Sequence, residues 1–368
     1  MKILILGGTG AIGAHLTKIL GGANSLCVTS RKKRISSENV KYIQGNAHDI
    51  NKTILKGEHF DVIVDFMSYK TDEFANKYEY YLKNTDQYVF LSSARVYADN
   101  GDKLISEESP RLLDVCSDNC YLNTDEYALT KARQENYLIN SDYKNWTIIR
   151  PYITYSEERL QLGVLEKEAW MFRAVNGHAI VFSKDIIDHV TTLTYGYDVS
   201  NAMAAVVGKK TSLGKIFHIT GEDCCTWREI LDTYIEVITE TTKREVNVVL
   251  QEKSIRLKSE NTKYQVKYDR CYNRRFDNES ISMYIDVHSF IPIKQGLTKC
   301  VKQFLEKPTF RQINIKEQAL FDRISKEVYT KDVFESKKSY FIYLLYRFVW
   351  GIELWDLFKQ KLRLLINR

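Results

Sequence analysis

The sequence predicts a doubly wound α/β fold, in which helices cover both faces of a parallel sheet. Two observations support this prediction. Apolar runs of strand length alternate with longer, helix-like segments, and the first run, Ile3–Leu6, leads directly into a glycine-rich turn and a helix. Continuous apolar strands between helices indicate a sheet buried on both faces. Ligands are then expected at the carboxyl ends of the strands.

The first half of the chain contains the clearest elements. Six strands are expected, and they are Ile3–Leu6, Leu26–Thr29, Val40–Ile43, Val62–Phe66, Tyr88–Leu91 and Trp146–Ile149. The clearest helices between them are Ala11–Leu20, Asp72–Lys83 and Glu126–Asn140.

Length and composition are those of an ordinary soluble globular protein with two unequal lobes. The chain has 368 residues, of which 44% are hydrophobic and 27% charged. We expect no membrane span, and no signal peptide because the opening strand is interrupted at once by Gly7-Gly8. The seven cysteines are scattered, which favours reduced thiols, a cytoplasmic location and no metal site.

The turn after the first strand has the spacing G-x-x-G-x-x-G. Glycines here permit a tight turn, close approach of the backbone to a pyrophosphate and close packing of the helix on the strand. The anion would lie on the free N–H groups at the helix N-terminus. We therefore expect a dinucleotide to contact Gly7, Thr9, Gly10, Ala11, Ile12 and Gly13.

The end of the second strand bears on the choice of dinucleotide. A carboxylate at this point favours NAD, whereas arginine favours NADP. Here the chain reads Thr29-Ser30-Arg31-Lys32-Lys33-Arg34, with no carboxylate before Glu38. We expect NADP, with NAD as the alternative, and contacts from Ser30 and Arg31.

A tyrosine and a lysine four positions apart share one face of an expected helix. Among 24 tyrosines only Tyr127 has a lysine, Lys131, four positions later. A phenol with a pKa near 10 is a weak acid–base group at neutral pH, and a nearby ammonium favours its ionised form. Ser93 lies just beyond the strand Tyr88–Leu91, at the carboxyl edge of the sheet, where ligands are expected. Tyr127, Lys131 and a serine of Ser92-Ser93 are therefore the candidate catalytic residues.

Together these motifs resemble the extended short-chain dehydrogenase/reductase superfamily, the nucleotide-sugar epimerase, dehydratase and reductase group. The resemblance covers about residues 1–308 and includes Gly7–Gly13, Ser92–Tyr97, Tyr127–Lys131, Arg150-Pro151 and Phe217–Gly221. It implies that Ser93 hydrogen-bonds the sugar hydroxyl or carbonyl, that Tyr127 transfers the proton at that oxygen, and that Lys131 holds the nicotinamide ribose and lowers the pKa of Tyr127. It also implies that the dinucleotide contacts Asn46, Ala47 and Phe66.

Departures from the family pattern narrow the reaction. The 4,6-dehydratases of this group carry an Asp-Glu pair after the catalytic hydroxyl residue, where this chain has Ala94-Arg95. Ile153 stands where the family has Asn, and a lid-like insertion is expected near Leu112–Leu122. The leading prediction is NADPH-dependent reduction of a 4-keto-6-deoxy sugar nucleotide, such as dTDP-4-dehydro-6-deoxyglucose, in surface polysaccharide biosynthesis. The alternatives are an NAD-retaining nucleotide-sugar 4-epimerase and a non-catalytic nucleotide- or RNA-binding relative.

The expected domain organisation has three parts. Residues 1–155, with a contribution from 186–205, form the dinucleotide-binding domain. Residues 156–185 and 206–308 form a smaller α+β substrate lobe, and 309–368 form a basic, aromatic helical extension. Arginine is the favoured cation for a sugar diphosphate, and the candidates in the smaller lobe are Arg173, Arg228, Arg274 and Arg275.

The C-terminal segment carries most of the net charge of +6. Residues 336–368 contain seven Lys or Arg and two acidic residues, so the rest of the chain is close to neutral and we expect no nucleic-acid partner. Tyr340–Asn367 has an apolar stripe of helical period. It fits peripheral attachment to the inner membrane surface, or docking on the chain's own body or on a sister subunit of a homodimer, and docking is favoured.

Overall fold

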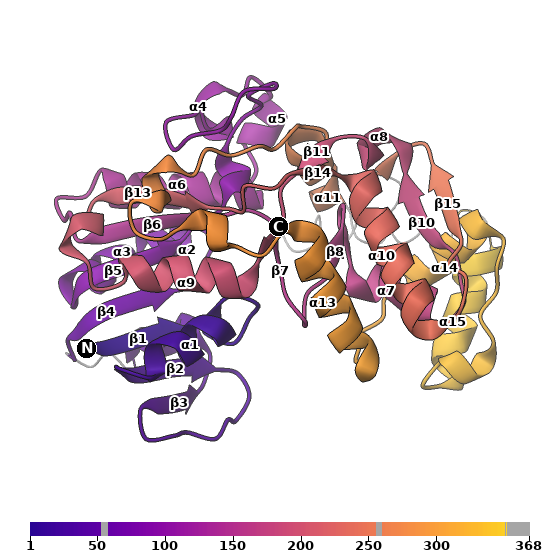
Figure 1. Ribbon diagram of the computed structural model, residues 1–368, viewed down its shortest axis with the longest axis horizontal. Helices are drawn as coiled ribbons and strands as arrows, with labels where there is room; N and C mark the ends of the chain where they lie inside the picture. Colours follow the sequence, from indigo (N-terminus) through magenta and orange to yellow (C-terminus); the bar gives the residue numbers. More distant parts are fainter. Residues whose placement is uncertain (53–57, 255–259, 350, 352–368) are drawn as a thin grey trace, which may run out of the picture.

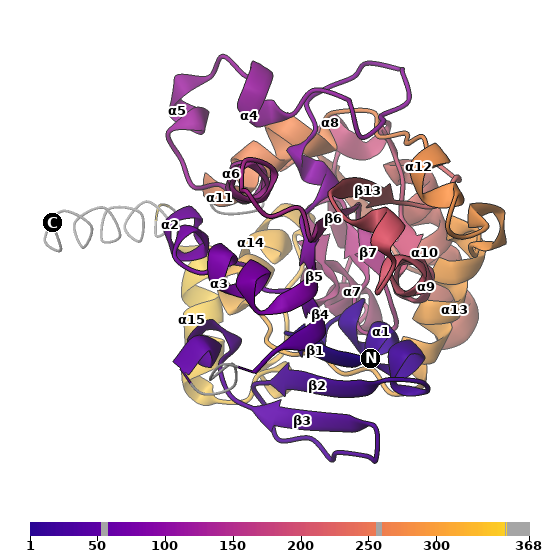
Figure 2. The ribbon, with the colours of Figure 1, turned by 90° about the vertical axis from the view of Figure 1, so that its left-hand side faces the viewer.

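The structure, a computed structural model, describes residues 1–52, 58–254, 260–349 and 351. Its centre is a sheet of seven strands in the order β13-β6-β5-β4-β1-β2-β3, which Figure 2 shows side by side. All neighbouring strands of this sheet run parallel. The predicted doubly wound fold is confirmed. The strands are β1 (Lys2–Leu6), β2 (Ser25–Ser30), β3 (Val40–Gln44), β4 (Phe60–Asp65), β5 (Thr85–Leu91), β6 (Trp146–Pro151) and β13 (Lys215–Ile219).

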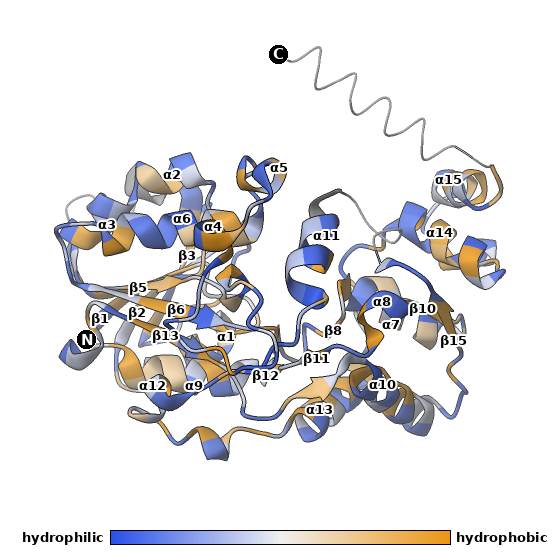
Figure 3. Cartoon of the chain, turned by 90° about the horizontal axis from the view of Figure 1, so that it is seen from above, coloured by the Kyte–Doolittle hydropathy of each residue, from blue (hydrophilic) through white to orange (hydrophobic). Residues whose placement is uncertain are grey.

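Alternate side chains of the strands feed two separate cores, which is why the strands read as unbroken apolar runs. Ile3 and Ile5 belong to one cluster, and Leu4 and Leu6 to the cluster on the opposite face. Figure 3 shows the sheet between the two helical layers. One layer contains α1 (Gly13–Gly21), α9 (Gly196–Val206) and α12 (Glu279–Ser282), and the other α2 (Thr71–Ala75), α3 (Tyr78–Lys83) and α6 (Tyr127–Ile139).

The seventh strand, β13, corrects part of the predicted organisation. All of 206–308 was expected in the smaller lobe, but β13 pairs with β6 in the central sheet, with Phe217 opposite Ile149. Phe217, His218 and Ile219 are all buried there. Pairing satisfies the backbone groups of this buried segment.

The predicted helix Asp72–Lys83 is also corrected, because it is divided into α2 and α3. The break lies at Asn76 and Lys77. The Asn76 side-chain amide donates to the Asp72 carbonyl at 2.9 Å. That carbonyl is the usual partner of the backbone N–H four residues later, so the side chain competes with the helix.

The smaller lobe packs around aromatic side chains. Trp170 stacks on Tyr234 at 4.4 Å between ring centroids, and Trp227 is buried in the same cluster. Figure 1 shows this lobe beside the sheet, with α10 and α13 side by side. Its helices are α7 (Lys167–Val175), α8 (Lys184–Ile187), α10 (Trp227–Thr242), α11 (Glu260–Gln265) and α13 (Ile293–Glu306). The short strands pair as β10 (Ile180–Ser183) with β15 (Val248–Gln251), β7 (Thr154–Tyr155) with β12 (Thr194–Tyr195), β8 (Gln161–Leu162) with β9 (Leu165–Glu166), and β11 (Val190–Thr191) with β14 (Cys225–Thr226).

The expected insertion near Leu112–Leu122 forms two short helices, α4 (Leu112–Val115) and α5 (Asn119–Leu122). It reaches from the sheet half of the molecule to the smaller lobe. Tyr121 of α5 stacks on Tyr268, with 4.4 Å between ring centroids. Tyr268 belongs to a π-helical turn, η5 (Val266–Arg270), which follows α11. The insertion therefore bridges the two halves beside the sheet's carboxyl edge.

The C-terminal extension contains α14 (Ile315–Ser325) and α15 (Lys337–Phe348). The two helices pack on each other through Ala319, Tyr343 and Tyr346. The rest of the predicted apolar stripe lies outside the described residues, at Ile352, Trp355, Leu362 and Ile366. None of the helices in the described ranges has the length and apolar content that spanning a bilayer requires.

Candidate active site

The glycine turn is built as its spacing predicts. Gly7 has φ +72°, a conformation that favours glycine, and its N–H donates to the Thr29 hydroxyl at 2.8 Å. A Cβ on Gly13 would lie 2.7 Å from the Gly8 Cα, so this glycine allows α1 to approach the strand end. A Cβ on Gly10 would have no atom within 4 Å. Gly10 is exposed at the cavity, and its backbone is accessible to a ligand.

Helix α9 packs against the glycine turn, a contact that the glycine spacing did not indicate. A Cβ on Gly196, the first residue of α9, would lie 2.4 Å from the Ala11 carbonyl oxygen. The Ser200 hydroxyl donates to the Ile12 carbonyl at 2.8 Å. These contacts fix the back of the turn and leave its other side open.

A cavity of about 730 Å³ joins the glycine turn to two of the three predicted catalytic residues. Ser93 and Tyr127 both line it. So do six of the predicted cofactor-binding residues, which are Gly7, Gly10, Ala11, Ile12, Gly13 and Phe66. A volume of this size accommodates a small-molecule ligand. The turn, the open Gly10 backbone and the cavity together fit a bound dinucleotide.

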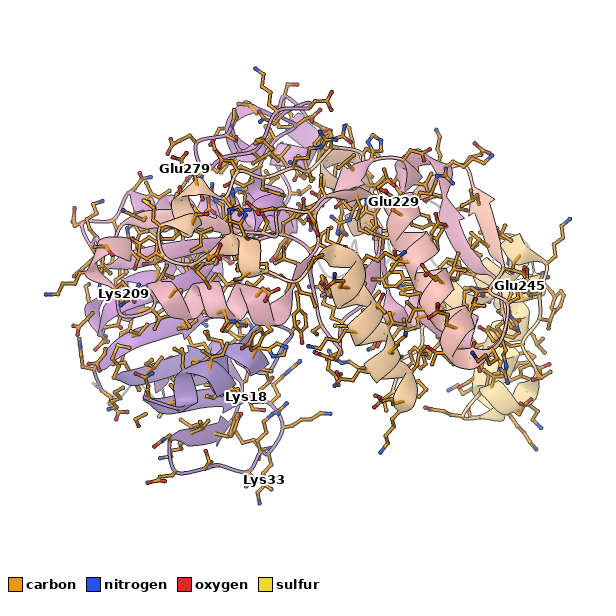
Figure 4. The ribbon with its side chains drawn as sticks, viewed as in Figure 1. Lys18, Lys33, Lys209, Glu229, Glu245 and Glu279 are labelled. Carbon is orange, nitrogen blue, oxygen red and sulfur yellow. The ribbon has the colours of Figure 1, made fainter. Side chains whose placement is uncertain are left out.

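The other predicted cofactor residues lie outside the lining of this cavity. Thr9 belongs to the turn itself, and its N–H donates to the Gly7 carbonyl. Ser30 is buried at the end of β2 and its hydroxyl accepts from the Lys32 N–H, whereas Arg31 is exposed. Figure 4 labels Lys33 on the same loop, with its side chain extending away from the sheet.

Asn46 and Ala47 follow β3 at the same edge of the sheet. The Asn46 side chain accepts from the His48 N–H and donates to the Asp49 carboxylate at 3.2 Å. Asn46 is exposed and Ala47 is buried. Asn46 thus organises its own turn.

Tyr127 is the first residue of α6, directly after the capping residue Glu126. Its side chain is 39% exposed and faces the cavity. Ser93, at the start of the short helix η2 (Ala94–Val96), interacts with the phenol. Burial of the phenol group raises the pKa of Tyr127, and the opposing effects come from Arg95, Arg159 and Ser93.

Lys131 lies one turn further along α6 and is almost fully buried. Its ammonium donates to the Leu91 carbonyl at 2.7 Å and to the Met67 carbonyl at 3.2 Å. Burial lowers the pKa of Lys131 to about 8, against the attraction of Asp65 and Glu135. The sequence predicted this effect on the Tyr127 pKa for Lys131, and in the structure the Arg95 guanidinium also holds the pKa of Tyr127 down against burial.

A buried carboxylate, Asp65, lies near Lys131, and the sequence had not indicated it as part of the site. It accepts from the Tyr88 and Tyr69 hydroxyls at 2.7 and 3.0 Å and from the Met67 N–H at 2.8 Å. Burial raises its pKa despite these bonds and the nearby Lys131. The position of Asp65 at the end of a strand is a signal, but its three partners are brought together only by the fold.

The cavity contains a set of cations that the sequence analysis did not select. They alternate with carboxylates, since Arg159 pairs with Glu166 at 3.2 Å and Lys167 with Glu168 at 2.6 Å. The lining cations are Arg95, Arg159, Lys167, Arg270 and Arg311, and the lining acids are Glu158, Glu166 and Glu168. Each of the other three cations also has a carboxylate partner, since Arg95 pairs with Glu126, Arg270 with Asp269 and Arg311 with Glu158.

The four arginines predicted for the diphosphate lie outside the cavity lining. Arg173 and Arg274 are fully buried and form ion pairs with Asp322 and Asp269 at 2.7 and 3.2 Å. Arg228 pairs with Asp188 at the surface. Arg275 is likewise no part of the lining. Residue type alone could not distinguish these arginines from those of the cavity.

Ile153 lies in the cavity wall with φ +26°, in the left-handed region. A β-branched residue rarely adopts this conformation, and it is retained only where the surrounding structure imposes it. Ile153 is buried, so packing holds it in place. The family's Asn, which tolerates this backbone better, is the residue that Ile153 replaces.

Comparisons with known proteins agree with this geometry. The model of a protein family described as "RmlD substrate binding domain" matches residues 1–305. A curated relative, the chloroplast stem-loop binding protein of 41 kDa b from Arabidopsis thaliana, is 26% identical over 245 residues. That match covers 61% of this chain and 60% of the relative.

Solved structures share the fold at low sequence identity. An epimerase from Methanothermobacter thermautotrophicus has a TM-score of 0.64 and 16% identity, covering 83% of this chain and 92% of its own. A dTDP-glucose 4,6-dehydratase from Bacillus anthracis, in complex with NAD, has a TM-score of 0.61 and 17% identity, covering 83% and 97%.

Proposed function

Because this chain belongs to the RmlD substrate-binding domain family, within the extended short-chain dehydrogenase/reductase superfamily, we propose that it reduces a 4-keto-6-deoxy sugar nucleotide with NADPH. A compound such as dTDP-4-dehydro-6-deoxyglucose is the expected substrate, in surface polysaccharide biosynthesis. One observation carries this proposal: Ser93 and Tyr127 line the same cavity as the glycine turn. A bound dinucleotide and a sugar would therefore meet beside the phenol.

The proposed mechanism assigns separate tasks to three side chains. The Ser93 hydroxyl hydrogen-bonds the ketone oxygen of the sugar and orients it toward Tyr127. The Tyr127 hydroxyl donates its proton to that oxygen as the alcohol forms. A bound nicotinamide supplies the hydride. We assign the holding of the nicotinamide ribose to Lys131, which lies one helical turn from Tyr127.

The cations of the cavity support an anionic substrate. Arg159, Arg270 and Arg311 line the cavity together with Ser93 and Tyr127. The planar guanidinium group suits two oxygens of one phosphate. We propose that they receive the diphosphate of the sugar nucleotide.

NADPH rather than NADH is proposed as the reductant because the loop after β2 is basic. Arg31 is exposed at the end of β2, where a 2′-phosphate is expected in this fold. We expect Arg31→Ala to weaken NADPH binding by about tenfold and to leave NADH binding unchanged. Dissociation constants for both nucleotides would measure this. Lys33→Ala, on the same loop, is the matched control, and an equal loss for both nucleotides in Arg31→Ala would contradict the assignment.

The reaction itself is tested by NADPH consumption with a panel of keto-sugar nucleotides. We expect Tyr127→Phe to lower kcat by at least about 100-fold, because the variant keeps the ring and loses the proton donor. Tyr137→Phe, on the same helix, is the control and should retain activity. An active Tyr127→Phe variant, or a wild-type protein inactive on the whole panel, would refute the proposal.

A nucleotide-sugar 4-epimerase is the main competing function, because it needs the same three side chains. The similar structure from Methanothermobacter is an epimerase, and the similar dehydratase holds NAD. An epimerase of this type would retain tightly bound NAD through purification. Release of the nucleotide by heat, followed by its identification, separates this function from an NADPH-dependent reductase.

RNA binding is a third candidate, favoured by the name of the curated stem-loop binding relative. A binding module has no need of both Tyr127 and Lys131, so we rank this function below the two reactions. If RNA binding depends on the basic C-terminal segment, deletion of residues 336–368 should abolish it. A gel-shift assay with a stem-loop RNA would show the difference.

We also propose a cytoplasmic location, where nucleotide sugars are made and used.

The exposed side chains Phe341 and Phe348 of α15 are the proposed contacts for self-association or for a membrane surface. Sedimentation of the protein with and without anionic vesicles distinguishes these two uses.

A further inference from the structure

Arg95 occupies a special place in the site, because its guanidinium lies against the Tyr127 ring. The Arg95 Cζ is 5.3 Å from the ring centroid. Both residues line the main cavity and also a second one of about 530 Å³, so they form part of the wall between the two. Lys131, in contrast, directs its ammonium at the carbonyls of Leu91 and Met67.

Both halves of the molecule hold this guanidinium. Its NH2 group pairs with Glu126 at 2.6 Å, and its Nε lies 3.7 Å from Asp269 of the smaller lobe. The Arg95 Nε is buried and has no hydrogen-bond partner among the residues that the structure describes. Glu126 in turn caps α6 by accepting from the Ala128 N–H at 2.8 Å, and it accepts from the Tyr121 hydroxyl at 3.1 Å. The insertion, the α6 cap and the smaller lobe thus meet at Arg95.

We propose that Arg95 is a positioning residue for Tyr127. The Arg95 guanidinium orients the phenol ring and stabilises the phenolate left after proton transfer. This inference rests on the proposed function. A cation within about 6 Å of an aromatic ring is attracted to its face, and it also favours an ionised form nearby. Because Asp269 belongs to the smaller lobe, the placement of this cation depends on how that lobe lies against the sheet.

The charges that face the phenol set the direction of the effect. Arg95 and Arg159 favour the ionised phenol, and so does the Ser93 hydroxyl. Glu126 opposes them. Arg95 is the largest of the favourable effects, so its loss should raise the pKa of Tyr127 more than the loss of Arg159.

The test is the pH dependence of kcat/KM for Arg95→Met and Arg95→Lys in the full-length protein. In the direction of reduction, two groups affect the alkaline side of the profile. Lys131 loses its proton near pH 8, and the higher limb reports Tyr127, because the phenol must hold its proton and burial raises its pKa. We expect Arg95→Met to move this alkaline limb upward by about one pH unit. Arg95→Lys keeps the charge and should leave the limb near its wild-type position. Arg228→Gln is the control, because Arg228 pairs with Asp188 at the surface and does not line the cavity.

A second measurement does not depend on activity. The ultraviolet absorbance of phenolate is titrated in each protein and in its Tyr127→Phe counterpart, and the difference reports Tyr127 alone. If wild-type protein reduces no keto sugar, the proposed function fails, and this titration still decides the role of Arg95. If Arg95→Met unfolds, the double variant Arg95→Met/Glu126→Gln is used instead, because it also removes the Glu126 carboxylate that has lost its arginine partner. An unmoved limb and an unmoved titration in a folded variant would overturn the inference.

Discussion

At the scale of single residues, the site depends on charges that the fold removes from water. Lys131 illustrates this, because it is 2% exposed and donates to two main-chain carbonyls rather than to a carboxylate. Neutral acceptors compensate an ammonium only in part. The folded protein therefore releases the proton of Lys131 near pH 8, well below the usual value for lysine.

This shift predicts a rise of stability with pH. An unfolded lysine keeps its proton to about pH 10.4, so between pH 8 and 10 the unfolded chain binds more protons than the folded one. Stability then increases with pH over this window. We expect the free energy of unfolding of the wild type, relative to Lys131→Met, to rise by about 2 kcal/mol from pH 8 to pH 10. Denaturant unfolding at each pH measures it.

The exposed Lys83, which pairs with Glu79, provides the control for this experiment. The Lys83→Met variant should show no such dependence, because its partner raises the pKa of Lys83. A constant difference between wild type and Lys131→Met across the window would show that Lys131 stays charged in the folded protein.

Residue spacing predicted part of this site and missed the rest for a physical reason. Ser93 and Tyr127 line one cavity because a strand end and a helix start meet at the sheet's carboxyl edge, which is a property of the fold class. Arg95 and Asp269 are 174 positions apart in the sequence. Their contact depends on how the smaller lobe is placed, and no local pattern encodes it.

At the scale of elements, the glycines of the turn have two different roles, one in packing and one toward the ligand. Gly13 is required for packing, because a Cβ there would meet the Gly8 backbone. Gly10 borders open space, so its role is toward the ligand. Glycine spacing predicted this turn, and apolar runs predicted the six strands around it. It could not predict the break between α2 and α3, which depends on one side-chain amide.

A pair of alanine substitutions tests these two roles. We expect Gly13→Ala to lower the free energy of unfolding by about 1–3 kcal/mol, since the backbone of Gly8 must move. Gly10→Ala should leave stability unchanged and weaken dinucleotide binding, because the methyl group enters the space next to the turn. Thermal unfolding without cofactor and a binding titration with it measure the two effects. Equal losses of stability in both variants would contradict this division.

At the scale of the whole molecule, a buried ion cluster ties the C-terminal extension to the smaller lobe. Arg173 of α7 lies between Asp322 of α14 at 2.7 Å and Glu327 at 3.0 Å. His178 contacts Asp322 at 3.0 Å and stacks on Tyr329 at 3.7 Å between ring centroids. The ligand atoms of His178, Asp322 and Glu327 lie within 4.8 Å of one another, but the Arg173 guanidinium already bonds both carboxylates. The cluster is thus a cross-link between α7 and the extension.

This cross-link predicts how the extension can be detached. We expect Asp322→Asn to destabilise the extension by about 3 kcal/mol, because it leaves the Arg173 charge buried and poorly compensated. Limited proteolysis should then cleave within residues 310–349 while the sheet half stays intact. The double variant Arg173→Met/Asp322→Leu removes both charges and should restore much of the resistance, since an apolar pair can replace a buried ion pair. If the double variant is as sensitive as Asp322→Asn, then packing between α14 and α15, rather than the charge pair, holds the extension in place.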